Sequence, residues 1–528
     1  MAKRPNFVLF LTDQQRADHL SCYGNPVLKT PNIDRIAAKG TRFESCFVAN
    51  PICMPNRASM MTGRMPSCHG VRANGIPLDL RARTFVEELR TAGYATALFG
   101  KAHFQNMTGR EREFDPEGTT KDEDGKVKEA VRRGLFGDDY EQENTLLWRN
   151  DPNHHVDTPF YGFDHVRLAT WHGDLCGGEY ERWLTERCGD PDAIRGADNA
   201  LPSNMAVPQA WRTSVPEDAY PSAFVGDTTL EYLDQRQADG DHRPFFLQVS
   251  FPDPHHPFTP PGKYWDMYDP DDIPLPDNFD QGSTALLEHM RRTRSEGTDN
   301  RNSQIPFAVS AREAKEAIAL TYGMIAMIDD QVGRVLDRLE EQGLMDDTVL
   351  IFASDHGDMM GELGILLKGP LHYRGATRVP LIWSDPKAQK PDGQQCDGLA
   401  SSIDIPATIL DRAGLKPYYG MQGQSLLPMI DGDGAGRDAV LIEDDRERKY
   451  LGFDQPQRLR SIVTAQHRLT IYRPSNIVEL YDLGADPGET TNIADDPAEA
   501  ETRAMMMEAL SNLMIDMQDK TPYMTGLA

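Results

Sequence analysis

The sequence predicts an α/β protein with a mainly parallel central sheet flanked by helices, and a smaller α+β subdomain at the C-terminal end. Two observations support the first part: short runs of near-continuous hydrophobicity, typical of strands buried on both faces, alternate with amphipathic helical stretches. The second part follows from a change to short, separate strand-like runs after about residue 435. With 528 residues, the chain is long enough for such a division.

Each of the predicted buried strands ends abruptly at polar residues. The strands are Phe7–Thr12, Ala95–Phe99, Phe245–Phe251 and Thr348–Ala353. The residues that follow them are, in turn, Asp13-Gln14, Gly100-Lys101-Ala102-His103, Pro252-Asp253-Pro254-His255-His256 and Ser354-Asp355-His356-Gly357. Because ligands bind beyond the carboxyl ends of parallel strands, we expect these side chains to share one site.

The remaining elements complete this plan. Helices are predicted at Thr84–Ala92 and Ala314–Gln342, the latter with apolar residues at helical spacing. Residues roughly 105–225, rich in Gly, Asp, Asn and Pro, are expected to form a long insertion over the end of the sheet, where specificity commonly resides. A polar stretch at about 277–306 has the composition of a surface loop.

The C-terminal part is predicted to be a separate unit. Short antiparallel strands are expected near residues 440, 461, 470 and 480, followed by a helix rich in Met and Ala at about 497–518. We therefore predict a catalytic domain over residues 1–435 and a subdomain over 436–528.

Composition restricts the partners and the compartment. Lys and Arg total 55 against 82 Asp and Glu, a net charge of −27, which disfavours nucleic acid and anionic membranes as partners. An anionic substrate would therefore need locally concentrated cations or a metal. The first apolar run is too short for a signal or a membrane span, and the seven cysteines include no CxxC pair. We expect a reduced, cytoplasmic protein with most thiols in its core.

A metal site is predicted from two strand ends. Asp13, Gln14 and Asp355 supply oxygen ligands, and His356 supplies an imidazole. Oxygen ligands suit Ca²⁺, Mg²⁺ or Mn²⁺, and the imidazole shifts the preference toward Mn²⁺ or another transition metal. Either pair alone would be more typical of a helix cap or a turn, but together they favour a metal.

Cys53 stands in the segment Ala49-Asn-Pro-Ile-Cys-Met-Pro-Asn-Arg-Ala-Ser-Met-Met-Thr-Gly63. A helix can start near Pro55, which would place Cys53 at a helix N-terminus beside Arg57. Both features favour an anion there, a thiolate or a bound oxyanion. Alone, the cysteine would more often be a buried residue in a turn.

Several further residues are candidates for acid, base and cationic roles, against the alternative of solvated lysines and structural histidines. They are Lys101, His103, His255 and Lys368. A reaction that expels an alkoxide or phenoxide needs a proton donor, and a developing oxyanion needs cations in a dry site.

Cys53-Met-Pro-Asn-Arg57 resembles the Cys-x-Pro-x-Arg signature of type I sulfatases, members of the alkaline phosphatase superfamily. Other motifs similar to that family lie along nearly the whole chain: Thr30–Arg35, Gly93–His103, the Pro-His255 element, Ser354–Gly357, and Glu479–Leu483 with Asp486-Pro and Asn492. The resemblance implies an alkaline-phosphatase-like fold and a cysteine oxidised to formylglycine by a maturation enzyme.

The resemblance also implies roles for the candidate residues. One divalent metal, Ca²⁺ or Mn²⁺, would be held by Asp13, Gln14, Asp355 and His356. The hydrate of formylglycine at position 53 would supply the metal-activated nucleophilic hydroxyl, and the cations on the sulfate oxygens would be Arg57, Lys101 and Lys368. His255, with Lys368, would protonate the leaving alcohol, and His103 would deprotonate the second hydroxyl, so that sulfate leaves and the aldehyde returns. Asn74 is expected to be a further polar contact with the substrate. His172 and His256, which the residues alone would leave as structural histidines, could also line the pocket as substrate contacts.

Some positions depart from the common sulfatase pattern. Gln14 and His356 replace an Asp and an Asn of calcium-binding members, and resemble phosphonate monoester hydrolases and choline-sulfatase-like members, which keeps Mn²⁺ as a rival to Ca²⁺. Asn56 stands where a small residue such as Ser is usual. Lys101 with His103 is a pair that phosphonate monoester hydrolases do not keep, and it favours a sulfatase.

The leading hypothesis is hydrolysis of an aryl or small alkyl sulfate, choline sulfate being one possibility if Trp171 contacts a quaternary ammonium. Phosphonate monoester or phosphate diester hydrolysis on the same site is the alternative. A metal- and anion-binding protein without turnover would result if Cys53 stayed a thiol. Enzyme size and symmetry predict a homo-oligomer.

Overall fold

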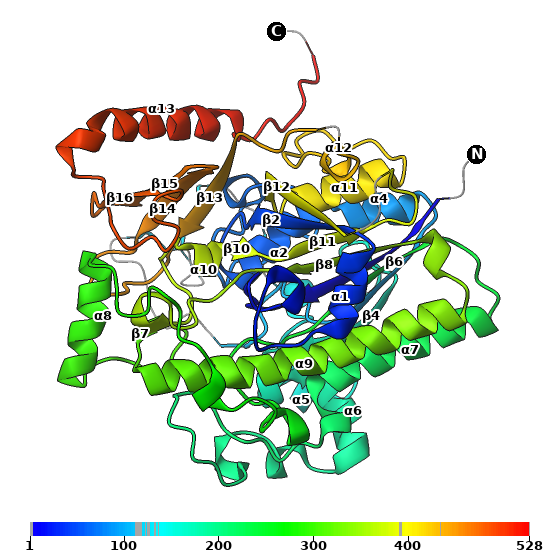
Figure 1. Cartoon of the computed structure of the whole chain (residues 1–528). Coiled ribbons are helices and arrows are strands. Elements are labelled where there is room, and N and C mark those ends of the chain that lie inside the picture. Colours follow the sequence, from blue (N-terminus) through cyan, green and yellow to red (C-terminus); the bar gives the residue numbers. More distant parts are fainter. Residues whose placement is uncertain are drawn as a thin grey trace.

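A mainly parallel, ten-stranded sheet runs through the molecule (Figure 1). The computed structural model describes residues 4–110, 119–121, 123, 127–130, 134–135, 137–389, 393–432 and 434–526. The strand order is β10-β2-β11-β8-β1-β6-β3-β4-β5, and β12 pairs with β2. The strands are β1 (Asn6–Thr12), β2 (Thr41–Phe47), β3 (Ala95–Gly100), β4 (His165–Thr170), β5 (Gly177–Gly178), β6 (Phe245–Ser250), β8 (Thr348–Ser354), β10 (Arg378–Val379), β11 (Leu381–Ser384) and β12 (Gln394–Ser401).

The centre of the sheet is parallel and buried on both faces, as predicted. β1 pairs in parallel with β6 and β8, and β3 pairs in parallel with β6 and β4. Alternate residues of β1 enter different cores: Val8 and Phe10 pack into one, and Phe7, Leu9 and Leu11 pack into the other. This arrangement explains the near-continuous hydrophobicity of the strand.

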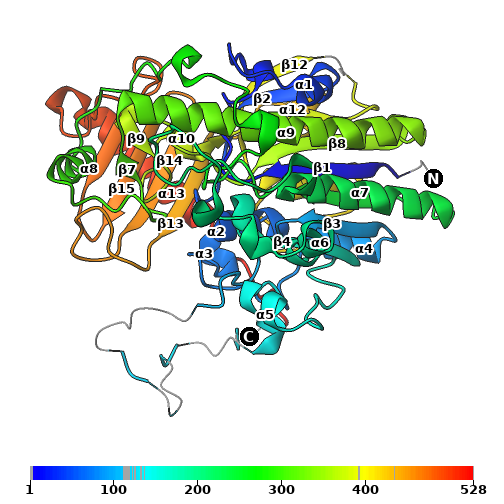
Figure 2. The ribbon, with the colours of Figure 1, turned by 90° about the horizontal axis from the view of Figure 1, so that it is seen from below.

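Helices cover the two faces (Figures 1 and 2). On one face lie α1 (Pro31–Ala38), α7 (Pro221–Ala238) and the long α9 (Ala311–Glu341). On the other lie α2 (Cys53–Thr62), α4 (Phe85–Thr91) and α11 (Asp404–Arg412). Ser310 and Glu313 form a capping box at the start of α9, which explains where that helix begins. Within the described residues, no helix is long and apolar enough to cross a membrane.

The C-terminal part forms its own antiparallel sheet, with the strand order β13-β14-β15-β16. The strands are β13 (Ala439–Asp445), β14 (Arg458–Thr464), β15 (His467–Arg473) and β16 (Val478–Asp482). Helix α13 (Ala500–Asp516) lies across this sheet in Figure 1 and buries Met506 and Leu510 in a small core with it. The predicted α+β subdomain is confirmed, while the division at residue 435 stays a prediction.

The structure corrects several sequence expectations. The stretch around 277–306 is not only a loop, since it contains α8 (Ala285–Glu296), capped by Thr284. The predicted insertion, part of which lies outside the described residues, contributes β4 and β5 to the central sheet and adds α5 (Thr145–Asn150) and α6 (Glu179–Cys188). All seven cysteines lie in the described part of the chain and are unpaired. Only Cys46, Cys53 and Cys176 are buried, so the expectation of mostly core thiols is wrong.

A matched pair of glycines tests how tightly the end of β3 is packed. Gly100 has a φ of +97°, and an added Cβ would lie 2.0 Å from the backbone oxygen of Ser250, whereas Gly93 has a φ of +92° and open space around it. We expect Gly93→Ala to cost about 1–2 kcal/mol of stability for its left-handed backbone. Gly100→Ala should cost a further roughly 1–3 kcal/mol, because backbone must move.

Equilibrium unfolding in urea, followed by far-UV circular dichroism, measures both variants. Equal midpoints for the two variants would contradict the close contact between β3 and β6.

Candidate functional site

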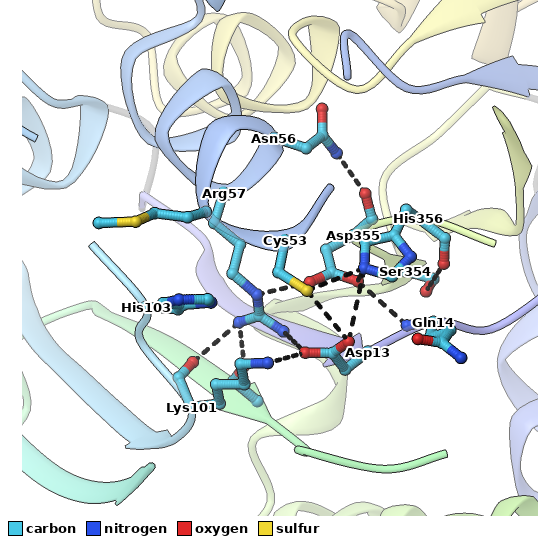
Figure 3. A network of polar contacts seen from close by, with 12 residues as sticks. Asp13, Gln14, Cys53, Asn56, Arg57, Lys101, His103, Ser354, Asp355 and His356 are labelled. Carbon is cyan, nitrogen blue, oxygen red and sulfur yellow. Dashed lines mark hydrogen bonds and ion pairs between the residues drawn. The ribbon is translucent and has the colours of Figure 1, made fainter. Parts of the chain in front are cut away.

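The carboxyl ends of five neighbouring strands, β8, β1, β6, β3 and β4, meet at one edge of the sheet. Backbone hydrogen bonds continue the ladder into the loops: Asp355 N donates to Thr12 O at 3.0 Å, and Lys101 N donates to Ser250 O at 2.9 Å. Their side chains converge there, as Figure 3 shows for three of the strands. Twelve site residues are at most 7% exposed: Asp13, Gln14, Cys53, Arg57, Lys101, His103, His172, His255, His256, Asp355, His356 and Lys368.

Cys53 is the first residue of α2 and lies at the centre of this group, as predicted. Its Sγ is 3.0 Å from His356 Nε2 and 3.7 Å from Asp13 Oδ1. Burial raises the pKa of the Cys53 thiol to about 12, and the neighbouring Asp13 carboxylate adds to the rise. A thiol in this position is therefore protonated near neutral pH, and the local field does not make it a reactive thiolate.

Asn56 fixes the first turn of α2. Its Nδ2 donates to the backbone oxygen of Asp355 at 2.5 Å, and its Oδ1 accepts from Ala49 N at 3.0 Å and from Ser402 Oγ at 2.8 Å. The larger residue in place of the usual small one thus has a structural purpose, since it ties the start of α2 to the loop after β8.

Arg57 links the two carboxylates from β1 and β8. Its Nε donates to Asp355 Oδ2 at 2.6 Å, and its Nη2 is 3.4 Å from Asp13 Oδ2. Nη1 donates to Lys101 O at 2.9 Å and to Ser250 Oγ at 3.0 Å. One guanidinium therefore holds four strand ends in register (Figure 3).

Oxygen and imidazole donors suited to a divalent metal lie on one side of Cys53. His356 Nε2 is 3.6 Å from Asp13 Oδ1 and 3.7 Å from Asp355 Oδ1. Burial alone would raise the pKa of Asp13, but the charges of Lys101 and Arg57 outweigh it and hold that pKa well below its usual range. Two carboxylates and an imidazole fit a hard cation such as Ca²⁺ or Mn²⁺.

Gln14 adjoins this donor set, with a backbone φ of +66° that is uncommon outside glycine. Its Nε2 donates to Asp358 Oδ2 at 2.5 Å and lies 3.1 Å from His256 Nδ1, while its Oε1 accepts from Lys368. These contacts fix which end of the carboxamide carries the oxygen that a metal would bind.

Cations and imidazoles lie on the other side of Cys53. Lys101 Nζ donates to Asp13 Oδ2 and to His172 Nε2, the latter at 2.7 Å. Lys368 Nζ donates to His255 Nε2 at 2.5 Å. The rings of His172 and His255 stack in parallel with centroids 3.5 Å apart, and His255 stacks on His256 at 4.1 Å.

These histidines are neutral. Burial lowers the pKa of His255 well below its usual value, and the charge of Lys368 lowers it further. Burial, His255 and Lys101 do the same to the pKa of His172. Since His255 Nδ1 donates to the backbone oxygen of His256, its Nε2 lone pair faces the ammonium of Lys368, and the two form one proton-donating unit.

His103 lies on the Arg57 side of Cys53 (Figure 3). Burial lowers the pKa of His103 well below its usual value, and Lys101 and Arg57 lower it further, so that its imidazole is a neutral potential base. Asn74, unlike the other predicted residues, is exposed, and its Oδ1 accepts from Met54 N at 3.3 Å, near the start of α2.

All thirteen predicted site residues therefore lie at or next to one centre. Residues that the sequence analysis missed are Asp358, which holds Gln14, and Glu143, which binds the backbone after Lys101. Asp358 stands two residues after His356, a spacing that could have drawn notice. Glu143 comes from a distant, irregular segment and carries no sequence signal. His172 follows β4, a strand that the analysis did not predict.

Comparisons with known proteins find similar sequences and a similar fold. The sulfatase family profile matches residues 5–415, and the profile described as N-sulphoglucosamine sulphohydrolase, C-terminal, matches residues 361–516. An arylsulfatase of Clostridium perfringens is 30% identical over 93% of this chain and 90% of its own length. A choline-sulfatase of Rhizobium meliloti is 27% identical over 94% of this chain and 83% of its own length. The crystal structure of a phosphonate monoester hydrolase of Agrobacterium radiobacter superposes with a TM-score of 0.75 at 28% identity, covering 98% and 97% of the two chains.

Metal binding at the donor set is testable without turnover. We expect millimolar MnCl₂ or CaCl₂ to raise the unfolding temperature of the wild-type chain, because a ligand present at about 100 times its Kd stabilises the folded state by about 2.7 kcal/mol. Asp355→Asn should lose most of this increment, since it removes a charged ligand.

The matched control is Asp385→Asn, which removes a buried carboxylate paired with Arg412 outside the site and should keep the increment. Differential scanning fluorimetry with and without metal measures this increase in the unfolding temperature. An undiminished increment in Asp355→Asn would place the metal elsewhere.

Proposed function

The chain belongs to the sulfatase family and is a sulfuric ester hydrolase, and we propose that Cys53, converted to formylglycine, is the nucleophile that acts on an aryl or small alkyl sulfate. The proposal rests mainly on one observation. Asp13 and Cys53 belong to two groups of potential ligands at once, one completed by Asp355 and His356 and the other by His172 and His255. An oxygen nucleophile at position 53 would thus stand between a metal-type donor set and a set of proton donors and cations.

Conversion of Cys53 to formylglycine would give this position the chemistry that a thiol lacks. An unmodified Cys53 thiol is buried, protonated and a poor ligand for a hard cation. A formylglycine hydrate would offer two hydroxyl groups on one carbon at the same place. One hydroxyl can attack sulfur, and the other can later expel the sulfate.

In the first step, one hydrate hydroxyl would lose its proton to solvent, its oxygen would form a bond to sulfur, and the bond from sulfur to the ester oxygen would break. The leaving alcohol takes a proton from the unit of Lys368 and His255, whose nitrogens are 2.5 Å apart. Lys101, Lys368 and Arg57 would hold the non-bridging oxygens of the transferred group.

In the second step, His103 takes the proton of the remaining hydroxyl. The carbon–oxygen bond to the sulfated oxygen then breaks, so that sulfate leaves and the aldehyde returns, ready to add water. His103 suits this role because its pKa is held low, which keeps the imidazole neutral and able to accept a proton.

Asp13, Asp355 and His356, with Gln14, would hold one divalent ion, Ca²⁺ or Mn²⁺. When bound, such an ion polarises the nucleophile and neutralises charge on the sulfate. Arg57 keeps the two carboxylates in place for it.

A small substrate fits the deep burial of the site residues. His172, His256 and Asn74 are proposed to contact the part of the substrate next to the sulfate. Trp171, beside His172 with ring centroids 5.5 Å apart, could bind a quaternary ammonium, and one relative is named a choline-sulfatase.

Phosphonate monoester or phosphodiester hydrolysis is the second candidate. The same site could carry out that reaction, and the fold of the chain is similar to that of a phosphonate monoester hydrolase. Binding without turnover is the third, if Cys53 remains a thiol. The maturation enzyme, the homo-oligomer and the cytoplasmic location stay predictions.

The decisive first experiment is the mass of the tryptic peptide carrying Cys53, from protein made in cells that have a formylglycine-generating enzyme. Conversion makes the peptide about 18 Da lighter than the thiol form. The same sample is then assayed on 4-nitrophenyl sulfate and 4-nitrophenyl phenylphosphonate, with Cys53→Ala as the inactive control. We expect conversion and a higher kcat/KM on the sulfate. A higher kcat/KM on the phosphonate would favour the second candidate, and full activity with an unmodified thiol would refute the mechanism.

The leaving-group role of His255 predicts a dependence on substrate chemistry. His255→Ala should lower kcat/KM by about 10²–10⁴-fold on an alkyl sulfate, whose alcohol needs a proton, and much less on 4-nitrophenyl sulfate. The exposed His155 provides the control, since His155→Ala should change neither rate. Equal losses on both substrates would show that His255 has another role.

A further inference from the structure

Glu143 lies beneath the loop that carries Lys101 and His103, and its side chain has no exposed surface. Its Oε2 accepts from His103 N at 2.6 Å, and its Oε1 accepts from Phe104 N at 2.7 Å and from Gln105 N at 2.9 Å. Three successive backbone N–H groups thus converge on one carboxylate, the arrangement that binds anions in many loops.

The loop needs such support because its conformation is unusual. His103 has a φ of +58°, a region that side chains other than glycine rarely adopt. The ring also lacks an anchor at one end, since His103 Nδ1 is buried without a hydrogen-bond partner among the described residues. The position of the imidazole therefore depends on the backbone that Glu143 holds.

Burying the carboxylate of Glu143 costs folding free energy. Glu143 forms no ion pair within the part of the chain that the structure describes. Burial raises the pKa of Glu143 to about 7, although the three N–H groups favour the ionised form. A charge buried without an ion pair is poor support for stability alone, and strained conformations held in this way cluster at functional sites.

We propose that Glu143 is a positioning residue that holds His103 in place to deprotonate the second hydroxyl of the nucleophile. This inference rests on the proposed function. It assigns to the segment 137–150 a part in the second step of the reaction, while the first step depends on groups that Glu143 does not touch, such as His255 and Lys368.

The test separates the two steps by burst kinetics. Glu143→Gln has the same shape, but its amide offers one acceptor oxygen and places a donor against a backbone N–H. With converted enzyme and saturating 4-nitrophenyl sulfate, we expect about one equivalent of 4-nitrophenol in a burst. The steady rate that follows should be about 10²-fold below the wild-type rate, as for a misplaced catalytic group. Intact-mass spectrometry of quenched samples should show the enzyme carrying one SO₃ group.

His103→Ala is the positive control and should give the same burst. Glu141→Gln is the matched control, because Glu141 is two residues away and, among the described residues, its side chain accepts a hydrogen bond from Asn144 Nδ2 and touches no part of the His103 loop; it should behave like the wild type. A loss of folded enzyme would lower burst and steady rate together, so it cannot imitate the expected result.

The outcomes separate this inference from the proposed function. If His103→Ala gives the burst and Glu143→Gln does not, Glu143 is not a positioning residue and the proposed mechanism stands. If neither variant gives a burst while the wild type turns over, the role proposed for His103 fails, and the inference fails with it.

Discussion

The contact on which the site depends is the buried guanidinium of Arg57 between the carboxylates of Asp355 and Asp13. Each of these groups is at most 1% exposed, so none of the charges is compensated by water. Removing one member of such a set leaves an unpaired buried charge, which typically costs about 3–5 kcal/mol. The same guanidinium also bonds Lys101 O and Ser250 Oγ, so the ends of β3 and β6 depend on it as well.

This balance of charges decides which groups can donate or accept protons. The lysines next to His172 and His255 donate hydrogen bonds to their Nε2 atoms, and burial with the positive field keeps the rings neutral. The ammonium beside such a neutral imidazole can pass a proton to a leaving group. His103, neutral for the same reasons but held by Glu143 on another side of Cys53, is placed to receive one. Different environments thus separate an acid from a base within one pocket.

The sequence was sufficient to predict the centre of the fold and which strand ends meet at the site, because both have local signals. Strands buried on both faces show as continuous apolar runs, and the polar residues that end them are adjacent in sequence, as with Ser354-Asp355-His356. The features that the sequence did not predict have weak local signals or depend on contacts between segments that are distant in the chain. β4 is only half buried over its first three residues, so its apolar signal is weak. Glu143 contacts His103 although 40 residues separate them in the sequence. Helix α8 was missed because its many polar and charged residues give the segment the composition of a surface loop. The catalytic roles of the site residues came from the resemblance to a known family, because the hydrophobic pattern of a sequence carries no information about such roles.

The negative charge of the whole molecule and the positive charge of the site can be reconciled by burial. The protein carries a formal charge of −27, yet by the same formal count the three cations Arg57, Lys101 and Lys368 outnumber the two carboxylates Asp13 and Asp355 around Cys53 by one. A divalent ion in the donor set would raise this local excess to three. Charges at the surface are screened over about 10 Å of salt solution, whereas those inside a dry site act on the bound group almost unscreened. The global field therefore opposes the approach of anions, and the local field holds one anion once it has arrived. A sulfate ester bears a single negative charge, fewer than a phosphate monoester at neutral pH, and so meets the smaller repulsion on its way to the site.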